Sequence, residues 1–193
     1  MKRLIFALGL MMLAIGCVGG GNNADDGELK ETSAPYKVGD LYFEDGVLGV
    51  VFDVTSDGMH GKIVSVDEDK MMWCDNSVYY DATYARDEYD GMVNTTEIMN
   101  RDNYNLYFAA WWCAECGSGW YLPAKSELEK IYQNWSTINN TLAKNGHYMI
   151  SDYYYWSSSE YDDHSVWYLY MRNGDTFNGN KFNKCYVRAV HAF

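Results

Sequence analysis

The stretch Gly119-Trp120-Tyr121-Leu122-Pro123-Ala124-Lys125-Ser126-Glu127-Leu128 (residues 119–128) leads into a helix. Pro123 is a residue type favoured at the start of a helix, and the carboxylate of Glu127 suits a first helical turn. Apolar residues then recur at helical spacing, at Leu128, Ile131, Tyr132, Trp135, Ile138 and Leu142. This pattern predicts one helix that ends at Gly146.

Short apolar runs separated by turn residues precede this helix. Asp45-Gly46 and Asp57-Gly58 punctuate the runs 40–43, 48–54 and 62–66, and Asp-Gly is typical of a β-hairpin turn. The sequence therefore predicts N-terminal β-hairpins.

Another helix and further strands complete the expected pattern. Asn94, with Glu97 three residues later, predicts the N-terminal cap of a helix that extends to about Cys113. Strands are expected after Gly146, with Asn173-Gly174 as a hairpin turn.

Residues 1–16 have the features of a secretory signal peptide. Lys2 and Arg3 precede an apolar run at 4–15, which is too short for a membrane-spanning helix. The end of this run, Ala14-Ile15-Gly16-Cys17, resembles a bacterial lipobox, and the resemblance implies that Cys17 is the lipidated first residue of the mature chain. Gly, Asn and Asp dominate the following residues, so we expect a flexible tether over 17–36 and one domain over 37–193.

The charge of the chain restricts its partners. The formal net charge is −12, and without Lys2 and Arg3 the chain has 13 basic and 27 acidic residues. Nucleic acids and anionic lipid surfaces require basic patches, so we expect neither as a partner. The expected location is the cell envelope, at the outer membrane, with membrane contact through the lipid anchor only.

Four cysteines follow Cys17, namely Cys74, Cys113, Cys116 and Cys185. An even number in an exported chain predicts disulfides, although the sequence leaves three pairings open. The run 112–116 resembles the Trp-Cys-x-x-Cys of thioredoxins, but the expected helix before it and Gly117-Ser118-Gly119 after it do not fit a redox site. A four-thiolate zinc site is an alternative with weak spacing evidence, so we expect no metal and no cofactor.

Residues 151–185 contain six Tyr, five Ser, four Asp and four Asn, a mixture typical of recognition surfaces. An ordinary Tyr-rich antiparallel sheet with polar turns is the alternative interpretation. We expect Trp120, Trp156 and Trp167 in the core. The expected ligand contacts are polar residues beside the turns, namely Tyr161, Asp162, Asp163, His164, Asn173, Asp175, Asn178, Asn180 and Lys181.

Four segments, 119–128, 155–161, 166–168 and 185–190, occur in the order found in the Fibrobacter succinogenes major paralogous domain family, and residues 39–65 resemble its Bacteroidales members. The resemblance implies an exported bacterial protein with an α+β, C-type-lectin-like fold, in which two helices pack on short antiparallel sheets after N-terminal β-hairpins. It also implies a disulfide from Cys113 or Cys116 to Cys185. Ala124 replaces the family's usual Thr at a helix cap, which predicts a loss of about 1 kcal/mol.

The resemblance carries no common activity, and the residues favour binding over catalysis. The histidines lack metal-ligand spacing, and no nucleophile elbow or phosphate-binding loop occurs, so we do not expect an enzyme. The calcium-binding triplet of sugar-binding C-type lectins is absent too. The predicted function is adhesion to a glycan or protein through the C-terminal face. The alternatives are a structural envelope or pilus-associated component, or the variable protein of a diversity-generating retroelement.

Overall fold

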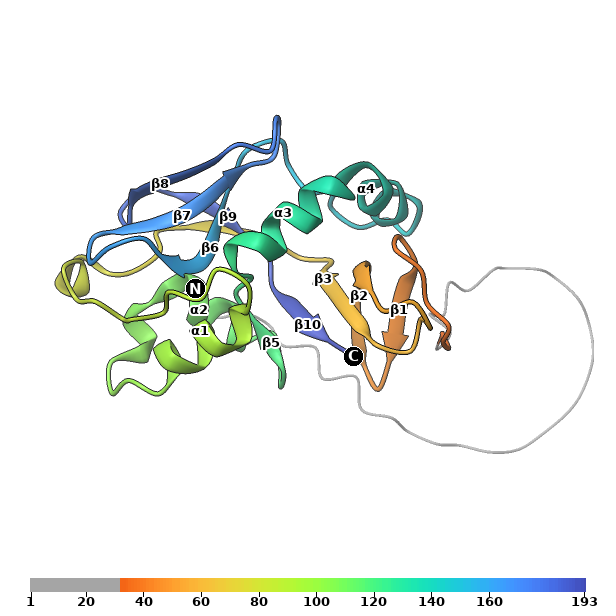
Figure 1. Cartoon of the computed structure of the whole chain (residues 1–193), viewed down its shortest axis with the longest axis horizontal. Coiled ribbons are helices and arrows are strands. Elements are labelled where there is room, and N and C mark those ends of the chain that lie inside the picture. Colours follow the sequence, from red (N-terminus) through yellow and green to blue (C-terminus); the bar gives the residue numbers. More distant parts are fainter. Residues whose placement is uncertain (1–31) are drawn as a thin grey trace, which may run out of the picture.

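A computed structural model describes residues 32–193, which form two five-stranded sheets and four α-helices (Figure 1). The predicted signal peptide, Cys17 and most of the predicted tether lie outside these residues. The mixed architecture confirms the α+β class. None of the helices within residues 32–193 is long and apolar enough to cross a membrane.

The first sheet, here sheet A, is antiparallel and contains the predicted N-terminal hairpins. Its strands, in spatial order, are β1 (Leu41–Glu44), β2 (Val47–Val54), β3 (Gly61–Ser65), β10 (Val190–Ala192) and β5 (Trp120–Tyr121). Asp45 and Gly46 join β1 to β2 with φ of 50° and 79°. Two positive φ angles are what a two-residue hairpin of type I′ requires, so the Asp-Gly prediction is confirmed.

The second sheet, sheet B, contains most of the C-terminal strands. Its spatial order is β4 (Asp69–Met71), β9 (Cys185–Val187), β6 (Tyr154–Glu160), β7 (Ser165–Tyr170) and β8 (Thr176–Asn180). The β6–β9 pair is parallel, and the other pairs are antiparallel. Gly174, with φ of 79°, lies in the predicted turn between β7 and β8.

The predicted helix from Asn94 to Cys113 is wrong in both its start and its continuity. The structure has α1 (Gly91–Met99), a short 3-10 turn, η2 (Tyr104–Leu106), and α2 (Phe108–Ala114). Asp90 is the N-cap of α1, because its side chain accepts hydrogen bonds from the backbone of Met92 and Val93.

Asn94 is buried inside α1 and has a different role. Its side-chain oxygen accepts from Asp87 N at 2.9 Å, and its amide donates to Asp87 O at 2.6 Å and to Ser158 Oγ at 3.0 Å. Asn94 therefore joins α1 to sheet B rather than capping the helix.

The helix predicted up to Gly146 is two helices, α3 (Lys125–Gln133) and α4 (Trp135–Lys144). They meet at Asn134, whose side-chain amide donates to Lys130 O and to Phe52 O, each at 3.1 Å. The apolar spacing holds across the break, since Leu128, Ile131, Ile138 and Leu142 all belong to one buried cluster. Figure 1 shows α3 and α4 following one another along one side of the two sheets.

Residues 32–36, which the sequence assigns to the tether, are packed against sheet A. Thr32 N donates to Phe43 O at 3.0 Å. Tyr36 is buried, with its ring centroid 5.1 Å from those of Tyr42 and Phe193. These five residues therefore belong to the folded domain.

Candidate functional site

The serines of the Tyr-Trp-Ser-Ser-Ser-Glu-Tyr segment are buried on β6 and do not form a surface. Ser157 Oγ donates to Trp167 O at 2.6 Å, and Ser159 Oγ donates to Asp87 O at 2.7 Å. Ser158 Oγ accepts from the side chain of Asn94. The recognition interpretation is therefore wrong for these serines, which join β6 to the surrounding elements.

The start of α3 has polar partners that replace the missing side-chain cap. Ala124 offers no acceptor, but Lys125 N donates to Ser159 Oγ at 3.1 Å, and Ser126 N donates to Glu88 O at 2.9 Å. The Ser126 bond satisfies a backbone donor that a Thr cap could have satisfied, and the Lys125 bond satisfies another unpaired donor of the first helical turn. The predicted loss at Ala124 is therefore offset by tertiary contacts.

The buried carboxylate of Glu127 connects four parts of the fold. It accepts from Ala124 N at 2.7 Å, Gly91 N at 3.1 Å, Tyr121 Oη at 2.8 Å and Lys62 Nζ at 2.5 Å. Burial, and then the adjacent carboxylate of Glu127, raises the pKa of Tyr121. Glu127 thus positions α1, α3 and sheet A relative to one another.

The structure does not bring the nine predicted contact residues into one site. Tyr161, Asp162, Asp163 and His164 form the β6–β7 turn, and Asn180 lies close to it because Ser165 pairs with Asn180. Asn173 and Asp175 lie in the β7–β8 turn, at the other end of the same hairpin. Asn178 is exposed on β8, between these two ends.

Lys181 is not a contact residue, because its side chain is 0% exposed. Its Nζ donates to Glu160 Oε1 at 2.7 Å, to Asp163 O at 2.8 Å and to Asp81 O at 3.2 Å. All three donors of the ammonium group are therefore used inside the protein, and the predicted ligand role is wrong.

Two of the three tryptophans expected in the core are buried, namely Trp120 and Trp156. Trp167 is only partly buried. Its ring contacts Tyr161 edge-on at 5.1 Å, and Lys125 Nζ lies 4.2 Å from its centroid. The core prediction is therefore wrong for Trp167, which belongs to the surface beside the β6–β7 turn.

The outer part of sheet B carries a group of aromatic side chains that the sequence reasoning missed. Register places Tyr154 opposite Tyr170, and Tyr168 opposite Phe177. The ring centroids are 4.5 Å apart for Tyr154 and Tyr170, 5.4 Å for Tyr154 and Tyr168, and 5.9 Å for Tyr168 and Phe177. Tyr154 and Phe177 remain 41% and 42% exposed. The sequence feature that could have predicted this group is the spacing by two residues of Tyr154 and Trp156, and of Tyr168 and Tyr170. In a strand, this spacing places both side chains of a pair on the same face of the sheet.

A cavity of about 330 Å³ opens among these rings. We call it the aromatic groove and define it by its lining residues, Tyr154, Tyr168, Asn183, Lys184 and Cys185. Burial raises the pKa of the Cys185 thiol to about 12, so this part of the lining is uncharged at neutral pH. Asn183 and Lys184 are exposed and add an amide and an ammonium group to the aromatic walls. This combination of apolar walls and a few polar groups is typical of ligand sites.

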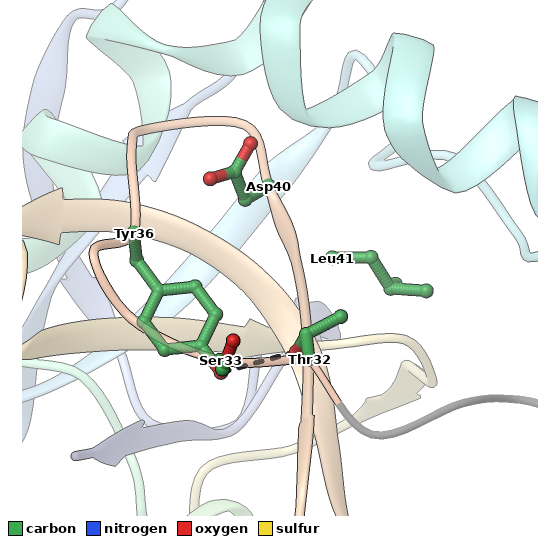
Figure 2. A pocket seen from close by; sticks show the side chains of 5 residues that line it. All are labelled: Thr32, Ser33, Tyr36, Asp40 and Leu41. Atoms are coloured by element: carbon green, nitrogen blue, oxygen red, sulfur yellow. Dashed lines mark hydrogen bonds between the residues drawn. The ribbon is translucent and has the colours of Figure 1, made fainter.

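Two further cavities are less suited to a ligand because their polar groups already have partners. Figure 2 shows a cavity of about 450 Å³ lined by Thr32, Ser33, Tyr36, Asp40 and Leu41. The Tyr36 hydroxyl donates to Glu44 and contacts Thr32 Oγ1, while Asp40 accepts from Lys37 N.

A third cavity, of about 350 Å³, lies beside β2, β3 and the C-terminal strand. The charged groups in its lining include Asp53 and Lys62. They pair with Lys130 and Glu127 respectively, so their charges are already matched within the fold.

Cys74, Cys113 and Cys185 are free, buried thiols, which contradicts the disulfide expected at Cys185. Cys116 is exposed, and its Sγ lies 3.5 Å from Trp112 O. Burial raises the pKa values of Cys74 and Cys113, which disfavours thiolate chemistry at these positions. Within residues 32–193, no group of three or more His, Cys, Asp or Glu side chains is placed to hold a metal ion.

Comparison with known proteins identifies similar folds and a family. A fimbrial protein from Bacteroides ovatus ATCC 8483 superposes with a TM-score of 0.68 at 17% sequence identity, over 87% of this chain and 51% of that one. The chain thus spans about half the length of that protein, and the likeness concerns the fold. No curated protein matches. The family model of the Lcl C-terminal domain matches residues 62–191, which include α1 to α4 and the whole of sheet B. The chain therefore belongs to the Lcl C-terminal domain family.

Proposed function

We propose that this protein is a lipid-anchored protein of the cell envelope that binds a glycan or protein ligand through the aromatic groove. The observation that carries the proposal is the groove itself, in which Tyr154 and Tyr168 contact each other edge-on beside Asn183 and Lys184. The rings are accessible because Tyr154 is 41% exposed. Exposed aromatic groups beside convergent polar groups are a common form of recognition site.

The chemistry of the groove suits ligands that combine apolar and polar surface. Tyrosine rings offer flat apolar area with little conformational entropy to lose on binding. The C–H face of a sugar ring, or an apolar side chain of a protein, would pack on Tyr154. Asn183 can donate and accept hydrogen bonds, while Lys184 only donates, so the two residues recognise hydroxyl, carbonyl or carboxylate groups.

The proposed export and anchoring rest on the N-terminal sequence, which resembles a signal peptide and a lipobox and so predicts a lipid on Cys17. The folded domain begins by Thr32, so about fifteen residues would separate the anchor from the fold. The Gly-, Asn- and Asp-rich sequence here predicts a flexible tether, for which a chain of that length has a typical end-to-end distance of about 20 Å. The groove would therefore be free to meet a ligand away from the membrane surface.

A glycan and protein array screened with the full-length chain in detergent tests this function. We expect a ligand whose signal is lost in Tyr154→Ser and kept in Tyr148→Ser, because Tyr148 is even more exposed than Tyr154 but does not line the groove. Every ligand signal persisting unchanged in Tyr154→Ser would contradict the assignment to the groove.

A structural role in a fimbria is the second candidate, favoured by the shared fold with the Bacteroides ovatus fimbrial protein. It predicts that the chain is recovered with filaments sheared from the cells. A binding protein without such a role would stay with the membrane fraction instead.

A further inference from the structure

The segment 75–90 is an irregular loop that carries exposed tyrosines beside the β6–β7 turn. It includes one short 3-10 turn, η1 (Asn76–Val78). Val78, Thr83 and Ala85 are buried and attach the loop, whereas Tyr80 and Tyr84 are 74% and 71% exposed. Tyr89, at the end of the loop, is 77% exposed, so the loop holds three large rings in solvent on a fixed backbone.

Tyr84 has a strained backbone, since its φ is +62°. A bulky side chain rarely adopts this left-handed conformation, which persists only where surrounding contacts impose it. Here Glu160 imposes it, because its buried carboxylate accepts from Thr83 N and Tyr84 N at 3.0 Å. Glu160 N also donates to Ala85 O at 2.7 Å. The Tyr84 side chain on this constrained backbone lies in solvent and not in the core.

The exposed rings continue onto the neighbouring turn. Tyr79 stacks on Phe182 at 3.9 Å and contacts Tyr80 at 4.6 Å, and Tyr80 lies 5.8 Å from His164. We call these residues, together with Tyr84, the tyrosine surface. It shares no residue with the aromatic groove.

Acidic groups surround the tyrosine surface. Asp81 and Asp163 are exposed and Asp162 is half-buried. Burial, then the neighbouring Tyr80 and the charge of Asp162, raises the pKa of Tyr79. Lys181 is buried against Glu160 and adds no exposed charge. The exposed charge is therefore mainly negative, and a cationic partner would complement it.

Arg86 shows how a cation is held at this surface. Its guanidinium carbon lies 5.8 Å from the Tyr84 centroid, and Nη2 lies 3.2 Å from Asp163 Oδ1. One guanidinium thus contacts a tyrosine face and a carboxylate together. Tyr80 and the next residue, Asp81, also provide an exposed aromatic ring and a carboxylate. Among residues 32–193, no Lys or Arg side chain lies over the Tyr80 ring.

We propose that the tyrosine surface binds an arginine-rich segment of a partner protein, with guanidinium groups on the exposed rings and paired with the flanking aspartates. Arginine suits the surface better than lysine, because its planar group stacks on aromatic rings while it pairs with a carboxylate. This interaction is additional to ligand binding in the groove and does not depend on it.

The probe is a fluorescent peptide of alternating Gly and Arg, titrated with the full-length chain in detergent at physiological ionic strength. Tyr80→Ala combined with Tyr84→Gly should weaken binding by about tenfold, the loss expected for two exposed cation–π contacts. Tyr84→Gly keeps the fold, since glycine adopts a positive φ without strain. The control is Tyr148→Ala with Tyr153→Ala, which removes exposed rings elsewhere and should leave binding within about twofold.

A charge-matched pair of variants separates this surface from the general acidity of the chain. Asp81→Asn with Asp162→Asn should weaken binding, while Glu97→Gln with Glu115→Gln, which removes two exposed charges elsewhere, should not. Equal losses of peptide affinity in the two charge-changed pairs would overturn the proposal. So would unchanged affinity in the variant that lacks Tyr80 and Tyr84, or binding of spermidine as tight as that of the peptide.

Discussion

Glu160 on β6 and Lys181 after β8 form an ion pair at 2.7 Å with both side chains 0% exposed. The remaining hydrogen bonds of both groups go to the backbone, with Lys181 donating to Asp81 O and Asp163 O, and Glu160 accepting from Thr83 N and Tyr84 N. The pair therefore fixes the loop 75–90 and the β6–β7 turn to the end of sheet B.

Lys181→Met should destabilise the domain by about 3–5 kcal/mol, because it leaves a buried carboxylate without its cation. Urea unfolding measures the change. Lys181→Met combined with Glu160→Gln should be less destabilised than the sum of the single variants, since the unpaired charge is gone. Arg172→Met removes the exposed pair with Asp152 and should change stability by less than about 0.5 kcal/mol. A loss at Lys181 no larger than at Arg172 would contradict the role of the buried pair.

Glu127→Gln should lower the free energy of unfolding by about 1–3 kcal/mol, because each carboxylate oxygen accepts from two donors and the amide nitrogen of Gln can accept from neither. The half-buried Glu129 on the same helix, changed to Gln, provides the control. Gly91→Ala tests the same junction from the other side. A Cβ at Gly91 would lie 2.4 Å from Leu122 O and 2.6 Å from Glu127 Oε2, so this variant should also be destabilised. Wild-type stability in both Glu127→Gln and Gly91→Ala would contradict the role of Glu127 in joining α1, α3 and sheet A.

His191 should make stability depend on pH between about 7 and 5. Its Nδ1 is buried and has no hydrogen-bond partner among residues 32–193, its ring lies 5.3 Å from Trp120, and burial lowers its pKa below the usual 6.5. The unfolded chain then takes up a proton at higher pH than the folded one. Stability should therefore fall as pH drops through about 6.5. His191→Gln should flatten this part of the profile, whereas His147→Gln should not, and an unchanged slope in His191→Gln would reject the assignment.

Cys17→Ser should release the protein from the membrane fraction, since the predicted lipid would have no attachment point. Fractionation of cells, with lipid labelling of the mature chain, measures this. The matched variant Cys116→Ser leaves the anchor intact and should stay in the membrane fraction. Lipid labelling that persists in Cys17→Ser would exclude this anchor.

Features with local causes could be predicted from the sequence. Asp45-Gly46 and Asn173-Gly174 marked hairpin turns because positive φ angles favour these residues. The apolar spacing from Leu128 to Leu142 identified the buried side of α3 and α4. The break at Asn134 depends on Phe52 O, 82 residues away, and neither Gly nor Pro marks it.

The burial of polar residues whose partners are distant in the sequence could not be predicted from local patterns. Ser159 and Lys181 look like surface residues in the sequence, yet their partners at Asp87 and Asp81 lie 72 and 100 residues away. The groove combines Tyr154 of β6 with Lys184, which directly precedes β9, and only the strand order of sheet B brings them together. Period-two spacing on β6 and β7 could have predicted a shared aromatic face, but spacing alone does not predict a cavity.

The affinity of the groove for the best ligand from the array tests the account most directly. Titration calorimetry should compare the wild type with Tyr154→Ser, Lys184→Gln and the control Tyr148→Ser, with a melting curve for each. Losing one central aromatic contact should weaken binding by at least about tenfold, while melting stays close to wild type because Tyr154 is partly exposed. Wild-type affinity in both Tyr154→Ser and Lys184→Gln would contradict ligand binding at the aromatic groove.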